Sequence, residues 1–349
     1  MKKYFKIVFA VVALMAILKV NAQQLSLSTN YIMNAYAYNP AVSGSVPFTK
    51  VNGFYRNQWT GFDGAPQTYM LNGHGPIKKL KNATVGGMVF SDKTGLITTT
   101  AGYLSFAYFV NVNKKTRFGL GLQGGVNQFK VRLYDVRAYD QGDEVLTGNI
   151  LTANALDAGA GLYLYSDKFF VGISDQHMMN NRVRSKYTNA GRVTPHLYGM
   201  IGYNIHAGKD VVVQPSILIK QNRNSYSLKG VPPLVQPEYS LKITYKDFCW
   251  IGSSYRTRDA ICFMAGVNVI KKLSVAYSYD YSLTAIKKYN QGSHEIMLSY
   301  TFVKVKKIDP DEEEMKAKDN SVHNSIKNKK TTTPQNIEDN KPKEEPKKD

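Results

Sequence analysis

The residue types that most often carry out chemistry are scattered along this chain. Its six histidines form no H-E-x-x-H pair or similar metal-binding spacing. The sequence contains no G-x-S-x-G nucleophile elbow and no phosphate-binding loop. We therefore expect no enzymatic activity, no cofactor and no metal site. The alternative is a hydrolase whose Ser, His and Asp residues meet from distant segments, because such triads are defined by geometry and not by spacing.

One glycine-rich stretch imitates a nucleotide-binding motif. Gly119, Gly121, Gly124 and Gly125 stand close together, as the glycines of a dinucleotide fingerprint do. That fingerprint requires a helix directly after the glycines, and the residues that follow here show no helical pattern. Close packing against the strand, or curvature of the sheet, is the better interpretation.

The two cysteines, Cys249 and Cys262, belong to neighbouring predicted strands. A hairpin centred on residues 256–259 places Cys249 near Gly266 and not opposite Cys262. An exported protein can form disulfides, but this strand register argues against one. The spacing of the two residues is also unlike that of a metal site.

The elements that would position all these residues are short alternating strands. In residues 273–281 every odd position is apolar or aromatic and every even position is small or polar. Residues 239–245 and 294–302 follow the same pattern. Because successive side chains of a strand point to opposite faces, each segment has one apolar and one polar face. The pattern predicts about fourteen strands, at residues 48–58, 66–73, 83–91, 98–110, 116–129, 154–165, 168–174, 196–206, 210–220, 238–245, 247–255, 260–269, 272–281 and 294–303.

The connectors between these strands predict a closed β-barrel in an outer membrane. The longer connectors all fall on one side of the sheet, and most connectors on the other side are tight turns, although residues 75–82 are long for such a turn. Outer-membrane barrels have short periplasmic turns and longer external loops. An even number of strands then places both termini in the periplasm. The alternative is a soluble β-sandwich, which would not need this asymmetry.

The strand faces can be assigned from the same alternation. On the first strand Arg56 falls on the polar face, which we assign to the lumen, and Trp59 falls on the apolar face, near the outer surface. Lys242, Asp280 and Glu295 also fall on lumen faces. A Lys or Arg on the lipid face at mid-membrane costs roughly 2–4 kcal/mol, so charges are expected inside. We expect these lumen charges to pair with one another.

The start of the chain has the features of a secretory signal peptide. Lysines precede an apolar core at residues 7–18, and small residues precede a cleavage point after Ala22. The apolar stretch is shorter than the ~20 residues that a transmembrane helix needs. We therefore predict a signal peptide at residues 1–22 and a mature chain that begins at Gln23.

Composition divides the mature chain into three parts. Residues 47–303 hold the strands of the barrel. A barrel of this size leaves a lumen that must be filled, and the aromatic and apolar residues of 23–46 are available as a plug or a periplasmic segment. Residues 304–349 contain no aromatic residue and alternate between acidic and basic patches. We expect them to form a disordered periplasmic tail.

The formal net charge of the chain is +19, and +14 of it belongs to residues 23–303. This excess would attract anionic lipopolysaccharide or an acidic partner chain. The alternative is that the basic residues only solvate loops and turns. Nothing in the sequence resembles a nucleic-acid-binding module, so we expect no nucleic-acid partner.

Several short motifs resemble those of the PorP/SprF family. They are Asn30-Tyr31-Ile32-Met33-Asn34, Asn39-Pro40-Ala41 with Gly44, Arg56-Asn57-Gln58-Trp59-Thr60-Gly61, Gly64-Ala65-Pro66-Gln67-Thr68 and the closing Gly292-Ser293-His294-Glu295-Ile296-Met297-Leu298. The resemblance covers about residues 24–303, and the charged tail lies outside the family pattern. Members of this family are outer-membrane proteins of the type IX secretion system of Bacteroidetes, and some serve gliding motility.

The resemblance implies a non-enzymatic secretion component that assists the secretion or surface anchoring of a partner protein. It implies work with the translocon and with periplasmic ring or peptidoglycan-linked proteins, and for some members a hold on the C-terminal domain of a secreted protein. A small-molecule porin or uptake channel is the alternative. The motif residues that form our candidate partner surface, with folding as their alternative role, are Asn39, Pro40, Gly44, Arg56, Trp59, Gly61 and Pro66.

Overall fold

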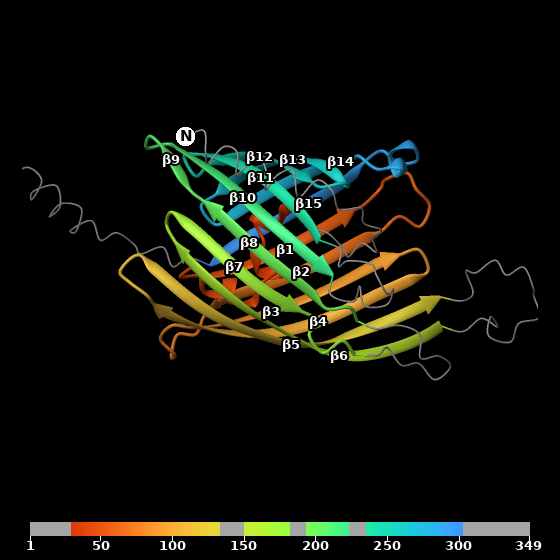
Figure 1. Ribbon diagram of the computed structural model, residues 1–349, viewed down its shortest axis with the longest axis horizontal. Helices are drawn as coiled ribbons and strands as arrows, with labels where there is room; N and C mark the ends of the chain where they lie inside the picture. Colours follow the sequence, from red (N-terminus) through yellow and green to blue (C-terminus); the bar gives the residue numbers. More distant parts are fainter. Residues whose placement is uncertain (1–28, 133–149, 182–192, 223–234, 303–349) are drawn as a thin grey trace, which may run out of the picture. The chain divides into compact units, whose positions relative to one another are not determined.

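The computed structural model describes residues 29–132, 150–181, 193–222 and 235–302, which form one antiparallel sheet rolled into a closed barrel (Figure 1). The predicted signal peptide and the tail lie outside the described residues. Within the described residues, no helix is long and apolar enough to cross a membrane. The strands are β1 (Thr49–Asn57), β2 (Gln67–Pro76), β3 (Ala83–Thr94), β4 (Ile97–Asn111), β5 (Thr116–Arg132), β6 (Ile150–Ser166), β7 (Phe169–Gln176), β8 (His196–Tyr203), β9 (Ile205–Ala207), β10 (Val211–Asn222), β11 (Val235–Tyr245), β12 (Cys249–Arg256), β13 (Ala260–Ile270), β14 (Leu273–Ser282) and β15 (Ser293–Phe302).

The ring closes where the first strand meets the last. Arg56 of β1 stands opposite Glu295 of β15 on one side and opposite Thr68 of β2 on the other. Elsewhere the strands pair in the order of the sequence. Closure removes the free edges of an open sheet, which is what a sheet that spans lipid requires.

β8 and β9 form a single interrupted strand. Both pair with β10, β8 up to Gly202 and β9 from Ile205, and the residues between them leave the ladder. The facing part of β10 contains Pro215, which has no backbone N–H to donate. Counted as one strand, β8 and β9 give the barrel fourteen strands, which confirms the predicted number.

The predicted alternation of side chains is confirmed along the strands. In β4, Leu104 is 76% exposed, whereas its neighbour Tyr103 is 4% exposed. In β15, Leu298 is half exposed and Met297 is buried. Large apolar side chains therefore cover the outside, where lipid is the solvent, while the alternate side chains of the same strands face the lumen.

The two ends of the barrel carry different connectors. One end, which we call the loop end, carries the longer connectors at residues 58–66, 133–149, 177–195, 223–234 and 283–292. The opposite end, the turn end, carries the connectors at residues 77–82, 112–115, 167–168, 208–210, 246–248 and 271–272. Two tight turns, at 95–96 and 257–259, also lie at the loop end, so long and short connectors do not alternate strictly. The connector that seemed long for a turn is shortened because β2 continues to Pro76.

The two cysteines are free, as the register predicted. Cys249 stands opposite Val267, one residue from the expected Gly266, and Cys262 stands opposite Ser254. The two side chains therefore lie on adjacent strands at different heights of the barrel.

Residues 29–46, which we call the plug, run through the lumen. They contain the short 3-10 helices η1 (Asn30–Ile32), η2 (Ala35–Ala37) and η3 (Pro40–Gly44). Tyr31 and Tyr38 of the plug pack in one buried cluster with Tyr198 and Leu218 of the barrel wall. A further 3-10 helix, η7 (Ala285–Lys288), lies in a connector of the loop end.

Candidate functional site

Arg56 lies inside the barrel between two carboxylates. Its Nη2 is 2.7 Å from Oδ2 of Asp280, and its Nη1 is 3.0 Å from Oε2 of Glu295. Glu295 stands directly opposite Arg56 in the sheet, and Asp280 comes from the next strand. All three side chains are almost completely buried. The structure thus brings together three of the residues that the alternation assigned to the lumen.

This ion pair is part of a larger buried cluster. Arg256 donates from Nε to Glu238 at 3.1 Å and from Nη1 to Asp259 and Asp280. Lys220 donates to Oε2 of Glu238 at 3.0 Å. Three cations therefore face four carboxylates. We call the whole group the ion cluster, and its members are Arg56, Lys220, Glu238, Arg256, Asp259, Asp280 and Glu295.

Thr29 joins the plug to the ion cluster. Its hydroxyl donates to the carboxylate of Asp280 at 2.8 Å and accepts from both Arg56 and Arg256. Its backbone N–H donates to Glu295 at 2.9 Å. These bonds satisfy buried charged groups, which would otherwise be costly inside the barrel. The plug is therefore fastened to the wall near the loop end.

Sequence reasoning missed four members of this cluster, namely Lys220, Glu238, Arg256 and Asp259. The available signal was the alternation itself, because Glu238 and Arg256 precede or follow outward-facing tyrosines, Tyr239 and Tyr255. The predicted strands 210–220 and 238–245 already contained Lys220 and Glu238, whereas the predicted strand 247–255 ended one residue before Arg256. Applying the alternation up to the observed strand ends would have placed Lys220, Glu238 and Arg256 in the lumen.

Lys242 also faces the lumen but lies outside the ion cluster. Its Nζ contacts Sδ of Met33 at 3.6 Å and lies 5.4 Å from the ring centre of Trp250. Within the described part of the chain, no carboxylate lies within salt-bridge distance of Lys242. The expectation that the lumen charges pair with one another is therefore wrong for this residue.

Asn39, Pro40 and Gly44 of the plug pack against the part of the wall opposite the ion cluster, and we call this contact the seat. Asn39 caps η3 by accepting from the N–H of Ala41 at 2.9 Å, and Pro40 occupies the first helical position, where no N–H is needed. The Asn39 amide also donates to the carbonyl oxygen of Leu162 at 3.0 Å. One side chain thus orders the plug and binds it to β6.

Glycines in the wall make room for this seat. A Cβ on Gly121 would collide with the backbone of Ala41, and a Cβ on Gly161 would collide with the side chain of Asn39. The close-packing interpretation of the glycine-rich stretch is therefore confirmed for Gly121. Gly44 ends the seat: its carbonyl accepts from the Tyr165 hydroxyl at 3.0 Å, and the ring of Phe109 occupies the space where its Cβ would lie.

Side chains of the wall also satisfy the plug's carbonyl groups. Ser174 donates to the carbonyl of Tyr38 at 2.6 Å, and Gln176 donates to that of Ala37 at 2.9 Å. Buried backbone groups need such partners when no ladder is available. The Tyr31 hydroxyl donates to Oγ of Ser240 at 3.0 Å.

The remaining motif residues lie in the 58–66 connector at the loop end. The N–H of Thr60 donates to the carbonyl of Gly292, and the N–H of Gly95 donates to that of Gly64, so three connectors are joined. Gly61 has φ +92°, a conformation that favours glycine. Trp59 has φ +55° and lies beyond the end of β1, so the strand alternation that assigned it to the lipid face does not reach it.

The polar contacts in the lumen therefore attach the plug to the barrel wall. The charges of the ion cluster are paired with one another and with the plug. Within the described residues, no group of three or more His, Cys, Asp or Glu side chains could hold a metal ion. The arrangement holds a segment of chain inside the barrel.

The chain is similar to a family of membrane proteins and to several solved structures. The family described as type IX secretion system membrane protein PorP/SprF matches residues 20–300. No curated protein matches the chain. The solved structures that it resembles in fold include the toluene transporter TbuX of Ralstonia pickettii (10% identity, 80% of this chain and 95% of that chain, TM-score 0.44), the toluene transporter TodX of P. putida (11%, 75% and 92%, 0.42) and the translocator domain of the autotransporter NalP from Neisseria meningitidis (10%, 79% and 93%, 0.40).

The family match spans most of the chain. It includes the plug and all the strands up to Tyr300, and with them every motif on which the resemblance rests. These strands form the closed barrel, and the family description names a membrane protein. The chain belongs to the PorP/SprF family of type IX secretion system membrane proteins.

Proposed function

We propose that this protein is a non-enzymatic component of the secretion system that holds or guides a secreted partner protein at the outer membrane. The single observation that carries the proposal is the plug, which runs through the lumen and is fastened near both ends of the barrel. A barrel whose lumen holds a fixed segment of its own chain serves better as an anchor than as an aqueous pore. An anchor for a gliding-related surface protein is one use of such a device.

The loop end is the surface that we assign to the partner's C-terminal domain. Connector 58–66 is tied by backbone bonds to residues 95–96 and 283–292, so the surface is ordered. Phe62 is 47% exposed and Tyr289 is 71% exposed at this end. Exposed aromatic side chains on an ordered backbone are typical of protein-binding surfaces.

Purification of the tagged protein from detergent-solubilised envelope tests this proposal. We expect a secreted protein and periplasmic secretion components to co-purify. The double variant Phe62→Ala and Tyr289→Ala should lose the secreted protein and keep the periplasmic components. The proposal fails if neither kind of partner co-purifies with the unaltered chain.

Conductance in a planar bilayer separates the anchor from an uptake channel. The plugged barrel should show no stable open state in most insertions, because the plug is held by buried bonds. Stable, ion-selective channels in the whole population would overturn the anchor proposal and favour the porin alternative.

We also propose that the turn end faces the periplasm, since external loops are the longer ones in such barrels. In a chain in which Cys249 and Cys262 are replaced by serine, Lys287→Cys marks the loop end and Lys114→Cys marks the turn end. A membrane-impermeant maleimide applied to intact cells should label the first variant and not the second. The reverse pattern would overturn this orientation.

A further inference from the structure

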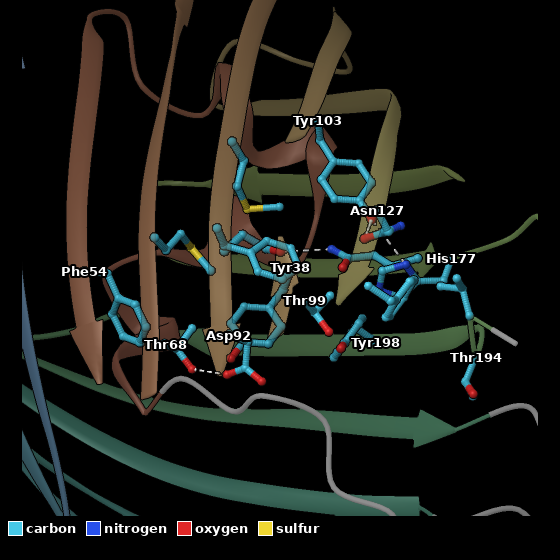
Figure 2. A pocket seen from close by; sticks show the side chains of 17 residues that line it. Tyr38, Phe54, Thr68, Asp92, Thr99, Tyr103, Asn127, His177, Thr194 and Tyr198 are labelled. Atoms are coloured by element: carbon cyan, nitrogen blue, oxygen red, sulfur yellow. Dashed lines mark hydrogen bonds between the residues drawn. The ribbon is translucent and has the colours of Figure 1, made fainter. Parts of the chain in front are cut away.

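A cavity of about 310 Å³ lies beside the plug, toward the loop end (Figure 2). Its floor includes Tyr38 of the plug, and its walls come from β1 to β5 and from the β7–β8 region. Many of the wall residues stand in the halves of their strands nearest the loop end, so the cavity lies on the side of the plug that faces that end. The volume is near the lower limit of small-molecule sites, enough for a compact organic group.

Most of the wall is aromatic or apolar. Rings of Tyr38, Tyr103 and Tyr198 stand around the cavity in Figure 2, together with Phe54. Aromatic faces attract cations when the cation lies within about 6 Å of the ring centre. Met70, Met88 and Phe90 complete the apolar part of the wall that the argument uses.

Among the described lining residues, Asp92 carries the only carboxylate. Asp92 is half-buried in the wall, where it accepts from the hydroxyls of Thr68 at 2.5 Å and Thr94 at 3.1 Å. In the described ranges no Lys or Arg forms a salt bridge with it. Two hydroxyl donors leave acceptor capacity on a carboxylate, which has about four lone-pair sites.

The other acidic group near the cavity is already occupied. Asp157 accepts from the Tyr103 hydroxyl at 2.7 Å and is bonded to Nδ1 of His177. Asn127 accepts from the same tyrosine at 2.9 Å. This network fixes the Tyr103 ring and its neighbours at one side of the cavity. Asp92 is thus the carboxylate available to a guest.

We propose that this cavity binds an ammonium or guanidinium group carried on an apolar or aromatic body. The cation would pair with Asp92, and the body would pack against the rings and methionines of the wall. An anionic ligand of the same shape would meet the Asp92 carboxylate, and no Lys or Arg is among the described lining residues to compensate it. The same chemistry is offered by a free organic amine and by a Lys or Arg side chain of an exported polypeptide.

Calorimetry on the purified full chain in detergent tests the proposal with three probes of one shape. They are 2-phenylethylamine, 2-phenylethanol and 3-phenylpropionate. We expect the amine to bind at least about tenfold more tightly than the alcohol, since a charge-assisted hydrogen bond is about twice as strong as a neutral one. The propionate should bind most weakly. Equal affinities for the three probes would overturn the proposal.

Substitutions locate the site. Asp92→Asn should weaken amine binding about tenfold and leave the alcohol unchanged, since it removes only the charge. Thr99 stands opposite Asp92 in the sheet, so Thr99→Lys should place an internal ammonium there and abolish amine binding. Asp63→Asn, an exposed acid of the same end, is the matched control and should have no effect. Heat-modifiable migration on a gel shows that each variant is folded.

Two further titrations distinguish the sources of the ligand. A hexapeptide with a central Lys is compared with the same peptide carrying norleucine at that position. Tighter binding of the Lys peptide, in competition with the amine, identifies a polypeptide side chain as the guest. Binding of the amine alone identifies a small molecule. Amine affinity that Asp92→Asn leaves unchanged would contradict the site, whatever partners the envelope experiment recovers.

Discussion

The two halves of the plug are held in different ways. Near the loop end, Thr29 is bonded to a cluster of buried charges that comes from strands on both sides of the closure. Toward the turn end, Asn39 and Pro40 lie against a wall in which glycines leave the space. The attachment at Thr29 depends on paired charges, so losing one charged partner should weaken it. The attachment at Asn39 and Pro40 depends on close packing, so an added side chain should weaken it. Opposite kinds of substitution should therefore reveal the two attachments.

The largest effect is expected from Arg56→Leu, which removes one cation from the ion cluster. Asp280 and Glu295 would remain buried with reduced compensation, and breaking a buried ion pair in this way costs about 3–5 kcal/mol. The urea midpoint and the yield of folded barrel should both fall. Lys93→Leu, an exposed site at the same end, is the control.

A normal urea midpoint for Arg56→Leu would show that the cluster does not stabilise the fold. If such a variant also failed in secretion, Arg56 would belong to a partner site and not to the attachment of the plug.

Gly121→Val tests the seat by adding volume. The new side chain would meet the backbone of Ala41, and overpacking of this kind costs about 1–3 kcal/mol of folding free energy. The control is Gly124→Val on the same strand, where a Cβ meets open space. The urea midpoint should be lower for Gly121→Val than for Gly124→Val. Equal midpoints would mean that the seat is not close-packed.

Thr29→Val tests the bond between the plug and the charges without altering a charge. The valine keeps the shape and loses the hydroxyl, so the cost is about 1.5–3 kcal/mol, the usual range for hydrogen bonds to charged groups. Thr98→Val on β4 is the control. Faster proteolysis of the plug than of the barrel would show local release, and identical digestion of both variants would contradict the attachment.

The smallest effect is expected from Tyr31→Phe, between the two attachments. It removes one neutral hydroxyl, which donates to Ser240 at 3.0 Å, at a cost of about 1 kcal/mol. Tyr108→Phe, on the lipid-facing side of β4, is the control and should leave the urea midpoint unchanged. If Tyr31→Phe lowers the free energy of unfolding as much as Arg56→Leu does, the two attachments of the plug do not act independently.

Much of the barrel was predictable because strand alternation is a local property. Residues 273–281 show their two faces in the sequence, and the same odd positions face outward in β14. The strand number follows from counting such segments. The errors lie at the strand ends, where β5 and β6 run further than the alternation suggested and the short turn 95–96 interrupts the series of long connectors.

The candidate site was predictable only in part. The sequence placed Asp280 and Glu295 in the lumen but did not indicate which cation each would meet. It treated Trp59 as part of a strand, because nothing local announced the left-handed residue that follows β1. Lys242 was grouped with the charges although it lies against Met33 and Trp250.

Neighbouring residues were enough to predict the repeating strand pattern, the apolar and polar face of each strand, and the family. The ion-pair partner of each charged residue follows only from the folded barrel. Arg56 and Asp280 are 224 residues apart, and they meet because β1 closes the ring against β15, beside β14. Such pairs depend on closure and on the path of the plug, which brings Thr29 to the charges and Asn39 to the glycines. No local pattern encodes either one.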